Sequence, residues 1–155
     1  EHTLNYLPGN SYNAYEISNF CKTGMECKHN LHYWKLDKYL AFGPSAHGFN
    51  GKIRWWNVRS LDEYYKKVNN NESPVENFEA LTKKNHFNEL IFNGLRMVEG
   101  ISTKKLTELF PRDIDHYLNA KLDKWDGLEV SKDRLFLNDR GIILADEIAS
   151  DLFID

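Results

Sequence analysis

The sequence of 155 residues has only two cysteines, Cys21 and Cys27. Two cysteines are too few for a disulfide scaffold, and their spacing matches no common zinc or iron–sulfur motif. We therefore expect reduced thiols and a cytoplasmic location. No run of apolar residues is long enough to span a bilayer. The chain also has no Ser-His-Asp order, no paired zinc motif and no H-E-x-x-H, so nothing indicates a hydrolase or a metalloprotease.

An excess of basic residues is absent as well. The net charge is -3 and the isoelectric point is about 6.1, so neither value favours general affinity for nucleic acid or an anionic membrane. The excess negative charge lies in the second half of the chain, whereas the aromatic residues are concentrated in the first half. A polar stretch at 69–74 separates the two halves. These shifts predict two domains, residues 1–71 and 72–155.

The second domain has the pattern of a winged-helix-like unit. Its predicted elements are helices over 82–98, 103–110 and 114–125, strands over 128–130 and 134–137, and a last helix capped by Asn138. Gly100 and Pro111 are the expected stops of the first two helices. Lysines of the second and third helices are interspersed with acidic residues, so we expect no DNA-binding face.

The first domain is less regular. Its predicted elements are strands over 11–18, 39–43 and 52–57, a helical turn over 30–34, and a helix from Ser60 to Val68. These strands have few evident partners within the chain. We therefore expect them to be part of a sheet that continues in a longer protein.

Tyr15 and Glu16 are the first candidates for ligand binding. A carboxylate beside an aromatic ring at a strand end can bind a ligand amine or hydroxyl. Glu16 is equally the expected polar residue of an ordinary alternating strand, and the spacing alone favours that interpretation.

The second candidate is the segment His29-Asn30-Leu31-His32-Tyr33-Trp34. In a helix, His29 and Tyr33 share a face. A neutral imidazole is a good axial ligand for haem iron, and the aromatic rings can stack on a macrocycle. Met25 and Cys27 are alternative iron ligands. The pattern alone favours a helix end whose aromatic residues fill a core.

Two further candidates follow along the chain. His47 ends the small-residue segment 42–47, in which glycine lets the backbone approach a ligand closely. Arg54 precedes Trp55 and can bind a propionate or make a cation–π contact. A tight turn and edge-strand packing are the competing interpretations of these two segments.

The order of these segments resembles the oxygen-independent coproporphyrinogen III oxidase-like family. The matching segments are 15–20, 29–34, 39–47 and 54–57, then Leu95-Arg96, 99–101 and 137–141. Each motif is weak by itself, but the ordered set covers nearly the whole chain. The H-N-L-x-Y-W pattern of residues 29–34 resembles the haem chaperone branch more than the oxidase branch.

The resemblance implies an α+β fold, with the last strands of a partial radical SAM barrel followed by a mostly helical winged-helix-like domain. Full-length family members carry a [4Fe–4S] cluster and S-adenosylmethionine, and a C-x3-C-x2-C motif early in the barrel holds the cluster. This sequence has no such motif, and Cys21 stands where the family has a small residue. We therefore expect a C-terminal fragment without catalytic residues and without ligands for the cluster.

The resemblance further implies part of a haem chaperone, which binds haem and delivers it to target proteins. His29 is then the best candidate for the haem contact, supported by Tyr33, Trp34 and His47. Tyr15, Glu16 and Arg54 are expected on the ligand side.

The expected partners are haem or a porphyrin, haem-receiving proteins that include a membrane-associated acceptor, and a second copy of the fragment, but no nucleic acid. One alternative is a fragment of a coproporphyrinogen III oxidase. Another is a winged-helix interaction module without any tetrapyrrole role.

Overall fold

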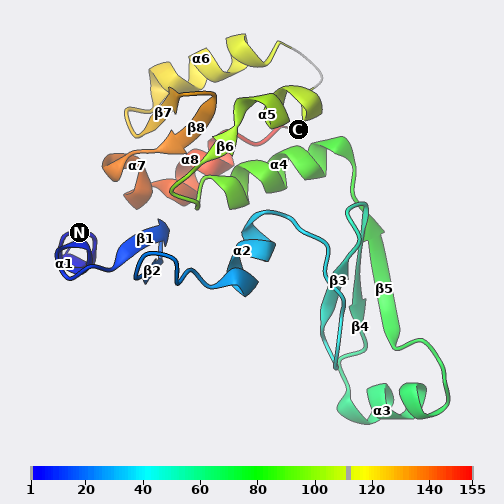
Figure 1. The fold of residues 1–155 in the computed structure, drawn as a ribbon. Coiled ribbons are helices and arrows are strands. Elements are labelled where there is room, and N and C mark those ends of the chain that lie inside the picture. The colour runs from blue at the N-terminus through cyan, green and yellow to red at the C-terminus, as the bar shows by residue number, and fades with distance from the viewer. Residues whose placement is uncertain (1, 111–112, 155) are drawn as a thin grey trace. The chain divides into compact units, whose positions relative to one another are not determined.

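The computed structural model describes residues 2–110 and 113–154, and the chain divides into two compact units (Figure 1). Unit 1 comprises Glu1–Lys35 and Lys83–Asp155, and unit 2 comprises Leu36–Thr82. This division differs from the predicted domains 1–71 and 72–155, which stay a prediction. The mixture of helices with small antiparallel sheets confirms the α+β class.

Unit 1 contains most of the helices. These are α1 (His2–Gly9), α2 (Lys28–Trp34), α4 (Lys83–Gly94), α5 (Thr103–Leu109), α6 (Ile114–Lys124), α7 (Asp139–Ile143) and α8 (Ala145–Asp151). Its strands are β1 (Asn13–Glu16), β2 (Asn19–Cys21), β6 (Ile101–Ser102), β7 (Leu128–Ser131) and β8 (Arg134–Leu137). The helical turn expected at 30–34 is confirmed as α2, and the predicted helices over 103–110 and 114–125 are confirmed as α5 and α6. The expected stop Pro111 lies outside the described residues.

The core of unit 1 is formed by the apolar faces of α4, α5, α6 and α8 against the small sheet. Its fully buried side chains include Phe87, Ile91, Leu95, Ile101, Leu106, Leu135, Ile148 and Leu152. Such side chains contribute about 1.5–3 kcal/mol each when removed from water. The hydrophobic spacing of the sequence therefore identifies the face that each helix buries.

The predicted hairpin over 128–137 is confirmed. Lys132 and Asp133 form its turn with φ of 49° and 61°, which matches the twist of the two strands. A third strand that the sequence did not predict, β6, pairs with β8, so the order is β6-β8-β7. Two residues are too few for a period-2 pattern to be recognised.

Asn138 caps the last helical segment as predicted. Its side-chain oxygen accepts hydrogen bonds from the backbone N–H groups of Arg140 (2.9 Å) and Gly141 (3.1 Å). The predicted single helix is divided, because Leu144 leaves helical geometry between α7 and α8.

The prediction of a helix over 82–98 is wrong at its end, because α4 stops at Gly94. The following residues pair with β1: the N–H of Ile17 donates to the carbonyl of Arg96 (2.9 Å), and that of Val98 donates to Tyr15 (3.3 Å). The β1 strand is also shorter than the predicted 11–18 and forms a hairpin with β2. Tertiary pairing thus overrides helical periodicity at this point.

Unit 2 is a three-stranded antiparallel sheet with one helix. Its elements are β3 (His47–Phe49), β4 (Ile53–Asn57), α3 (Leu61–Asn69) and β5 (Val75–Ala80), in the strand order β3-β4-β5. The predicted strand over 52–57 and the helix capped by Ser60 are confirmed; the Ser60 side chain accepts a hydrogen bond from Glu63 N–H (3.3 Å).

Two expectations for this region are wrong. Residues 39–43 form no buried strand: only Tyr39 makes an isolated bridge, and Phe42 is 80% exposed. The predicted strand over 52–57 also has partners within the chain, because β4 pairs with β3 on one side and β5 on the other. The strand β5 was not predicted, because most of its residues are exposed and many of them are polar.

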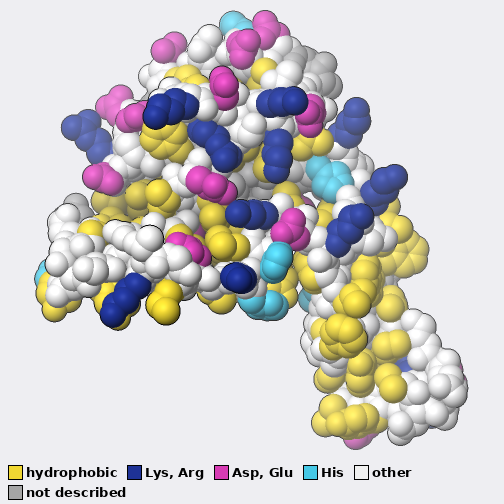
Figure 2. Space-filling view, viewed as in Figure 1, with side chains coloured by type: hydrophobic (Ala, Val, Ile, Leu, Met, Phe, Trp, Pro, Cys, Tyr) yellow, Lys and Arg dark blue, Asp and Glu magenta, His cyan; other side chains and the backbone are white. Residues whose placement is uncertain are grey.

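Side chains on the face drawn in Figure 2 differ between the units. Basic and acidic side chains are interspersed over unit 1, whereas hydrophobic side chains gather over unit 2. The exposed hydrophobic residues of unit 2 include Leu40, Phe42, Leu61, Tyr65 and Phe78. Within the described ranges, no helix combines the length and apolar character needed to cross a membrane.

Candidate functional site

Helix α2 presents two of the predicted haem contacts on its surface. The rings of His29 and Tyr33 meet edge to face, with centroids 5.0 Å apart and planes at 86°. Both side chains are exposed, as is the second imidazole of this helix, His32. The helical spacing in the sequence therefore gave the correct pairing of His29 with Tyr33.

Trp34, at the end of α2, has a different environment. The guanidinium of Arg96 lies 5.0 Å from its ring centroid, a distance at which a cation–π contact forms. The indole Nε1 is buried, and no hydrogen-bond acceptor for it is present in the described part of the chain. Trp34 therefore packs inside unit 1, while His29 and Tyr33 remain exposed.

Glu16 is fully buried at the end of β1. Its Oε1 accepts hydrogen bonds from the N–H of Ser18 (2.7 Å) and from the side chain of Asn19. Its Oε2 lies 3.4 Å from Nε of Arg96. A buried carboxylate needs a charge partner and hydrogen bonds. Oε1 of Glu16 is hydrogen-bonded, whereas Oε2 has the charge of Arg96 nearby but no hydrogen bond. A direct ligand contact of Tyr15 or Glu16 stays a prediction.

The sequence did not assign a role to Arg96, which joins Glu16 to Trp34. Its only signal was membership of the segment Leu95-Arg96 in the family resemblance. Its partners, the acidic Glu16 and the aromatic Trp34, lie more than sixty positions earlier in the sequence. A local sequence pattern therefore does not indicate these contacts. Arg96 Nη1 also lies 3.9 Å from the exposed carboxylate of Asp146.

His47 and Arg54 belong to unit 2, whereas the other candidates belong to unit 1. His47 is exposed, with its ring 5.9 Å from that of Trp56. Arg54 pairs with Glu79 (3.3 Å) and lies over the ring of Phe49 at 5.6 Å. The competing interpretation, strand packing, thus accounts for the contacts of Arg54, and a ligand role for either residue stays a prediction.

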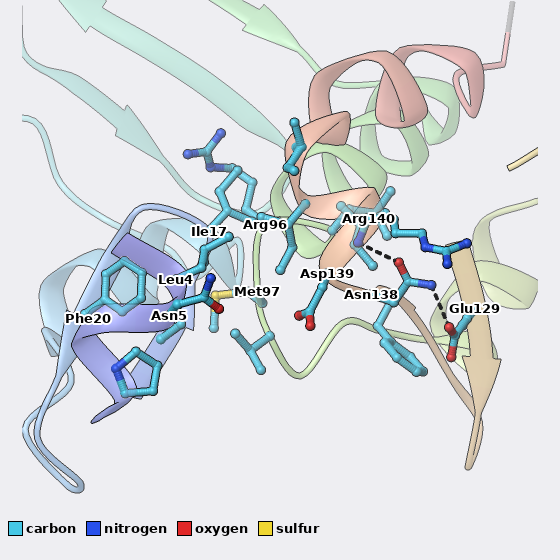
Figure 3. Close-up of a pocket in the computed structure, with 18 of the residues that line it drawn as sticks. Leu4, Asn5, Ile17, Phe20, Arg96, Met97, Glu129, Asn138, Asp139 and Arg140 are labelled. Carbon is cyan, nitrogen blue, oxygen red and sulfur yellow. Dashed lines mark hydrogen bonds between the residues drawn. The ribbon is translucent and has the colours of Figure 1, made fainter. Parts of the chain in front are cut away.

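A groove of about 1290 Å³ opens in unit 1 between the α1–β1–β2 segment and the β8–α7 segment (Figure 3). Ile17 and Met97 line it together with other apolar residues, and Arg96 and Arg140 contribute positive charge. Asn138 forms the hydrogen bonds drawn there, to Glu129 (2.6 Å) and from Arg140 N–H. His29 and Tyr33 do not line this groove.

The cysteines do not form a metal site in this structure. Cys21 lies on β2 and Cys27 precedes α2, and both are free thiols. Loss of solvation, followed by the charge of Glu26, raises the pKa of the Cys21 thiol, which opposes the thiolate form that binds metals. Among the described residues, no group of three or more His, Cys, Asp or Glu side chains is placed to hold a metal ion. The chain therefore does not fit a cluster that needs three cysteines.

Comparison with known proteins gives one matching family model, the HemN C-terminal domain, over residues 81–144. A relative named heme chaperone HemW from Bacillus subtilis (strain 168) is 32% identical over 151 residues, covering 96% of this chain and 40% of the relative. The protein of the same name from Mycobacterium tuberculosis (strain H37Rv) is 34% identical over 138 residues, covering 89% of this chain and 34% of the relative. The chain thus spans 40% or less of the length of these two relatives.

A solved structure shares the fold. The structure described as coproporphyrinogen III oxidase (HemN) from Escherichia coli, a radical SAM enzyme, matches 96% of this chain and 38% of its own chain, with a TM-score of 0.71 and 16% identity. That likeness supports the arrangement of elements and not an activity. The sequence relatives, the family model and the shared fold agree with the resemblance of the ordered motifs. Residues 81–144 of the chain belong to the HemN C-terminal domain family, and the chain over nearly its whole length is similar to proteins named heme chaperone HemW.

Proposed function

We propose that this protein binds haem on α2, with His29 as the iron ligand, as part of a HemW-like haem chaperone. The observation that carries the proposal is the exposed His29 imidazole in edge contact with the Tyr33 ring. The relatives named heme chaperone HemW support the choice of ligand class.

The chemistry of α2 suits this role. A neutral imidazole can bind iron through a ring nitrogen. The Tyr33 ring, 40% exposed, offers an apolar surface beside it for the edge of a macrocycle. His32 supplies a second exposed imidazole three residues after His29, and Met25 and Cys27 remain alternative ligands.

The proposed role is binding and transfer. The cluster and S-adenosylmethionine belong to the chemistry of full-length family members, and the cysteines of this chain do not supply the cluster ligands. Delivery of haem to an acceptor protein, including a membrane-associated one, and association between copies of the chain are further parts of the proposal.

Haem titration of the protein tests the assignment. We expect a shifted Soret band with the wild-type chain, and a weakened and displaced band with His29→Ala. His116→Ala is the matched control, because His116 is an exposed imidazole on α6. An unchanged spectrum in His29→Ala removes His29 from the site, and the same measurement on His32→Ala then tests the second imidazole.

The same titration separates the alternatives. A winged-helix interaction module without a tetrapyrrole role predicts no Soret shift in the wild-type protein. A coproporphyrinogen III oxidase origin rests on the shared fold at 16% identity and on the family model. It predicts tighter binding of the porphyrinogen substrate than of haem, whereas a chaperone predicts the reverse.

A further inference from the structure

We infer that Arg96 is a positioning residue for α2, and that Glu16 sets the orientation of Arg96. This inference rests on the proposed function, because it concerns the helix that carries His29. It assigns the contacts among the buried Glu16, Arg96 and Trp34 a role in holding the proposed haem-contacting face in place.

Helix α2 cannot hold its own position. It has seven residues, none of them buried, and its N-cap residue Cys27 makes no side-chain cap. Isolated helices shorter than about 12–15 residues are marginal in water. The helix therefore depends on contacts with the rest of unit 1.

Among the described residues, an ion pair and a cation–π contact connect the end of α2 to the segment that follows α4. One is the ion pair between Lys35 and Glu99 at 3.8 Å, whose side chains are about half exposed. Exposed pairs of this kind contribute little to stability. The other is the Arg96 guanidinium over the Trp34 ring, which is partly desolvated and therefore the stronger attachment.

Glu16 fixes Arg96 from the other side. Because the Glu16 side chain is 0% exposed, its carboxylate needs the positive charge of Arg96 within the same buried space. The hydrogen bonds from Ser18 and Asn19 to Oε1 hold that carboxylate in one orientation. Its second oxygen lies 3.4 Å from Nε of Arg96, and the central carbon of the same guanidinium lies 5.0 Å from the Trp34 ring centroid.

The backbone holds the base of this network rigid. Ile17 N–H donates to the Arg96 carbonyl, and Glu16 lies opposite Met97 in an antiparallel bridge. Backbone hydrogen bonds therefore hold the end of β1 beside the Arg96 segment. The Trp34 contact joins that segment to the end of α2, so loss of the contact loosens the helix without removing His29.

Substitution of Arg96 by Lys separates charge from geometry. A lysine keeps the positive charge near Glu16 but has neither the planar face nor the Nε position. We expect faster amide exchange over residues 28–34 and about a tenfold rise in the apparent haem Kd, since a helix that is held only part of the time binds more weakly. The Soret band at saturating haem should keep its wild-type position, because the iron ligand is intact.

The matched control is Arg134→Lys. Arg134 is also in unit 1 and pairs with Glu99 at 3.7 Å, whereas the guanidinium that the structure places over Trp34 is that of Arg96. We expect Arg134→Lys to leave both amide exchange over α2 and haem affinity near wild type. Equal behaviour of the two Arg→Lys variants, or no effect of Arg96→Lys, would overturn the inference.

A second pair of variants tests the same contact from α2. Trp34→Phe keeps an aromatic face under the guanidinium and should leave amide exchange of residues 28–34 close to wild type. Trp34→Leu removes that face and should accelerate the exchange as Arg96→Lys does. If amide exchange over residues 28–34 is the same in Trp34→Phe and Trp34→Leu, the Arg96–Trp34 contact does not hold α2. This comparison remains valid if the Arg96→Lys variant does not fold. Because amide exchange is measured without haem, absence of haem binding by the wild-type protein would reject the proposed function and leave this test intact.

Discussion

Gly127 and Gly141 lie so close together that neither position has room for a side chain. A Cβ atom on Gly141 would stand 2.1 Å from the carbonyl oxygen of Gly127, and one on Gly127 would stand 2.4 Å from Cα of Gly141. The same carbonyl of Gly127 accepts a hydrogen bond from Asn138 N–H (3.0 Å). The start of β7 and the first turn of α7 are therefore joined backbone to backbone.

Gly141→Ala should destabilise unit 1 strongly. The added methyl group meets backbone atoms, which cannot rotate away, so we expect a loss of about 3 kcal/mol in the free energy of unfolding. Urea denaturation measures this loss. Gly9→Ala is the control, because its Cβ would meet nothing within 4 Å; a comparable loss in both variants would contradict the explanation.

Asp151 should make stability depend on acid pH. Hydrogen bonds from Lys124 (2.6 Å), Trp125 (2.9 Å) and Lys121 (3.0 Å) hold its pKa well below the usual 3.8. A lowered pKa in the folded state gives stability above pH 3.8 that is lost as the pH falls toward the folded pKa. Asp151→Asn should therefore unfold more easily at pH 7, by about 1–3 kcal/mol.

Urea denaturation of wild type and Asp151→Asn across pH 7 to strongly acidic pH tests this linkage. The difference between them should narrow below pH 3.8, the usual pKa of the group. Asp123→Asn, at an exposed position on α6, the helix that carries Lys121 and Lys124, serves as the control. A difference that stays constant down to the lowest pH would show that charge on Asp151 is not the cause.

Tyr117 should make stability depend on alkaline pH. Its hydroxyl donates a hydrogen bond to the carbonyl of Leu152 (2.7 Å), and burial, followed by the charge of Asp151, raises its pKa from 10.0 to about 12. A raised pKa in the folded state gives stability that is complete below pH 10 and is lost as the pH rises through 12. Tyr117→Phe should lose about 1 kcal/mol at neutral pH, and its stability should fall less on the alkaline side.

Ultraviolet titration of the phenolate and urea denaturation between neutral and alkaline pH measure the two effects. Tyr65→Phe is the control, because Tyr65 is 57% exposed on α3. The explanation fails if Tyr117→Phe loses stability above pH 10 as steeply as wild type does.

Asn57 should be important for the stability of unit 2. Its side chain is buried, and Nδ2 donates a hydrogen bond to the carbonyl of Gly43 (2.9 Å). Asn57→Ala leaves that carbonyl without its partner, at a cost of about 1–3 kcal/mol. Amide exchange over β4 should accelerate in this variant and stay unchanged in Asn69→Ala, an exposed position on α3. Slow exchange in both variants would show that the bond does not hold the loop to the sheet.

The sequence predicts the elements whose determinants are local. The turn at Lys132 and Asp133, the cap at Asn138 and the spacing of His29 and Tyr33 each depend on residues within a few positions of one another. Because these determinants are local, α7, the β7–β8 hairpin and the His29–Tyr33 ring pair lie where the sequence pattern predicts them.

Features that depend on distant partners are absent from the local pattern. The end of α4 at Gly94 follows from pairing of the next residues with β1, and β5 becomes a strand only because β4 lies beside it. The burial of Glu16 likewise requires Arg96, and the two residues are separated in the sequence by the whole of unit 2. The pairing of His29 with Tyr33 could therefore be predicted from the sequence. The contacts of Arg96 with Glu16 and Trp34 could not.

Unit 1 is assembled from two stretches of chain, with all of residues 36–82 inserted between them. Its assembly therefore requires closure of a loop that contains a whole structural unit, before β1 and α2 can gain their contacts with α4 and Arg96. Loop closure of this length has an entropic cost that rises only slowly with further residues. Because its contacts with α4 and Arg96 join residues far apart in the sequence, the N-terminal segment should be among the last parts of unit 1 to dock during folding.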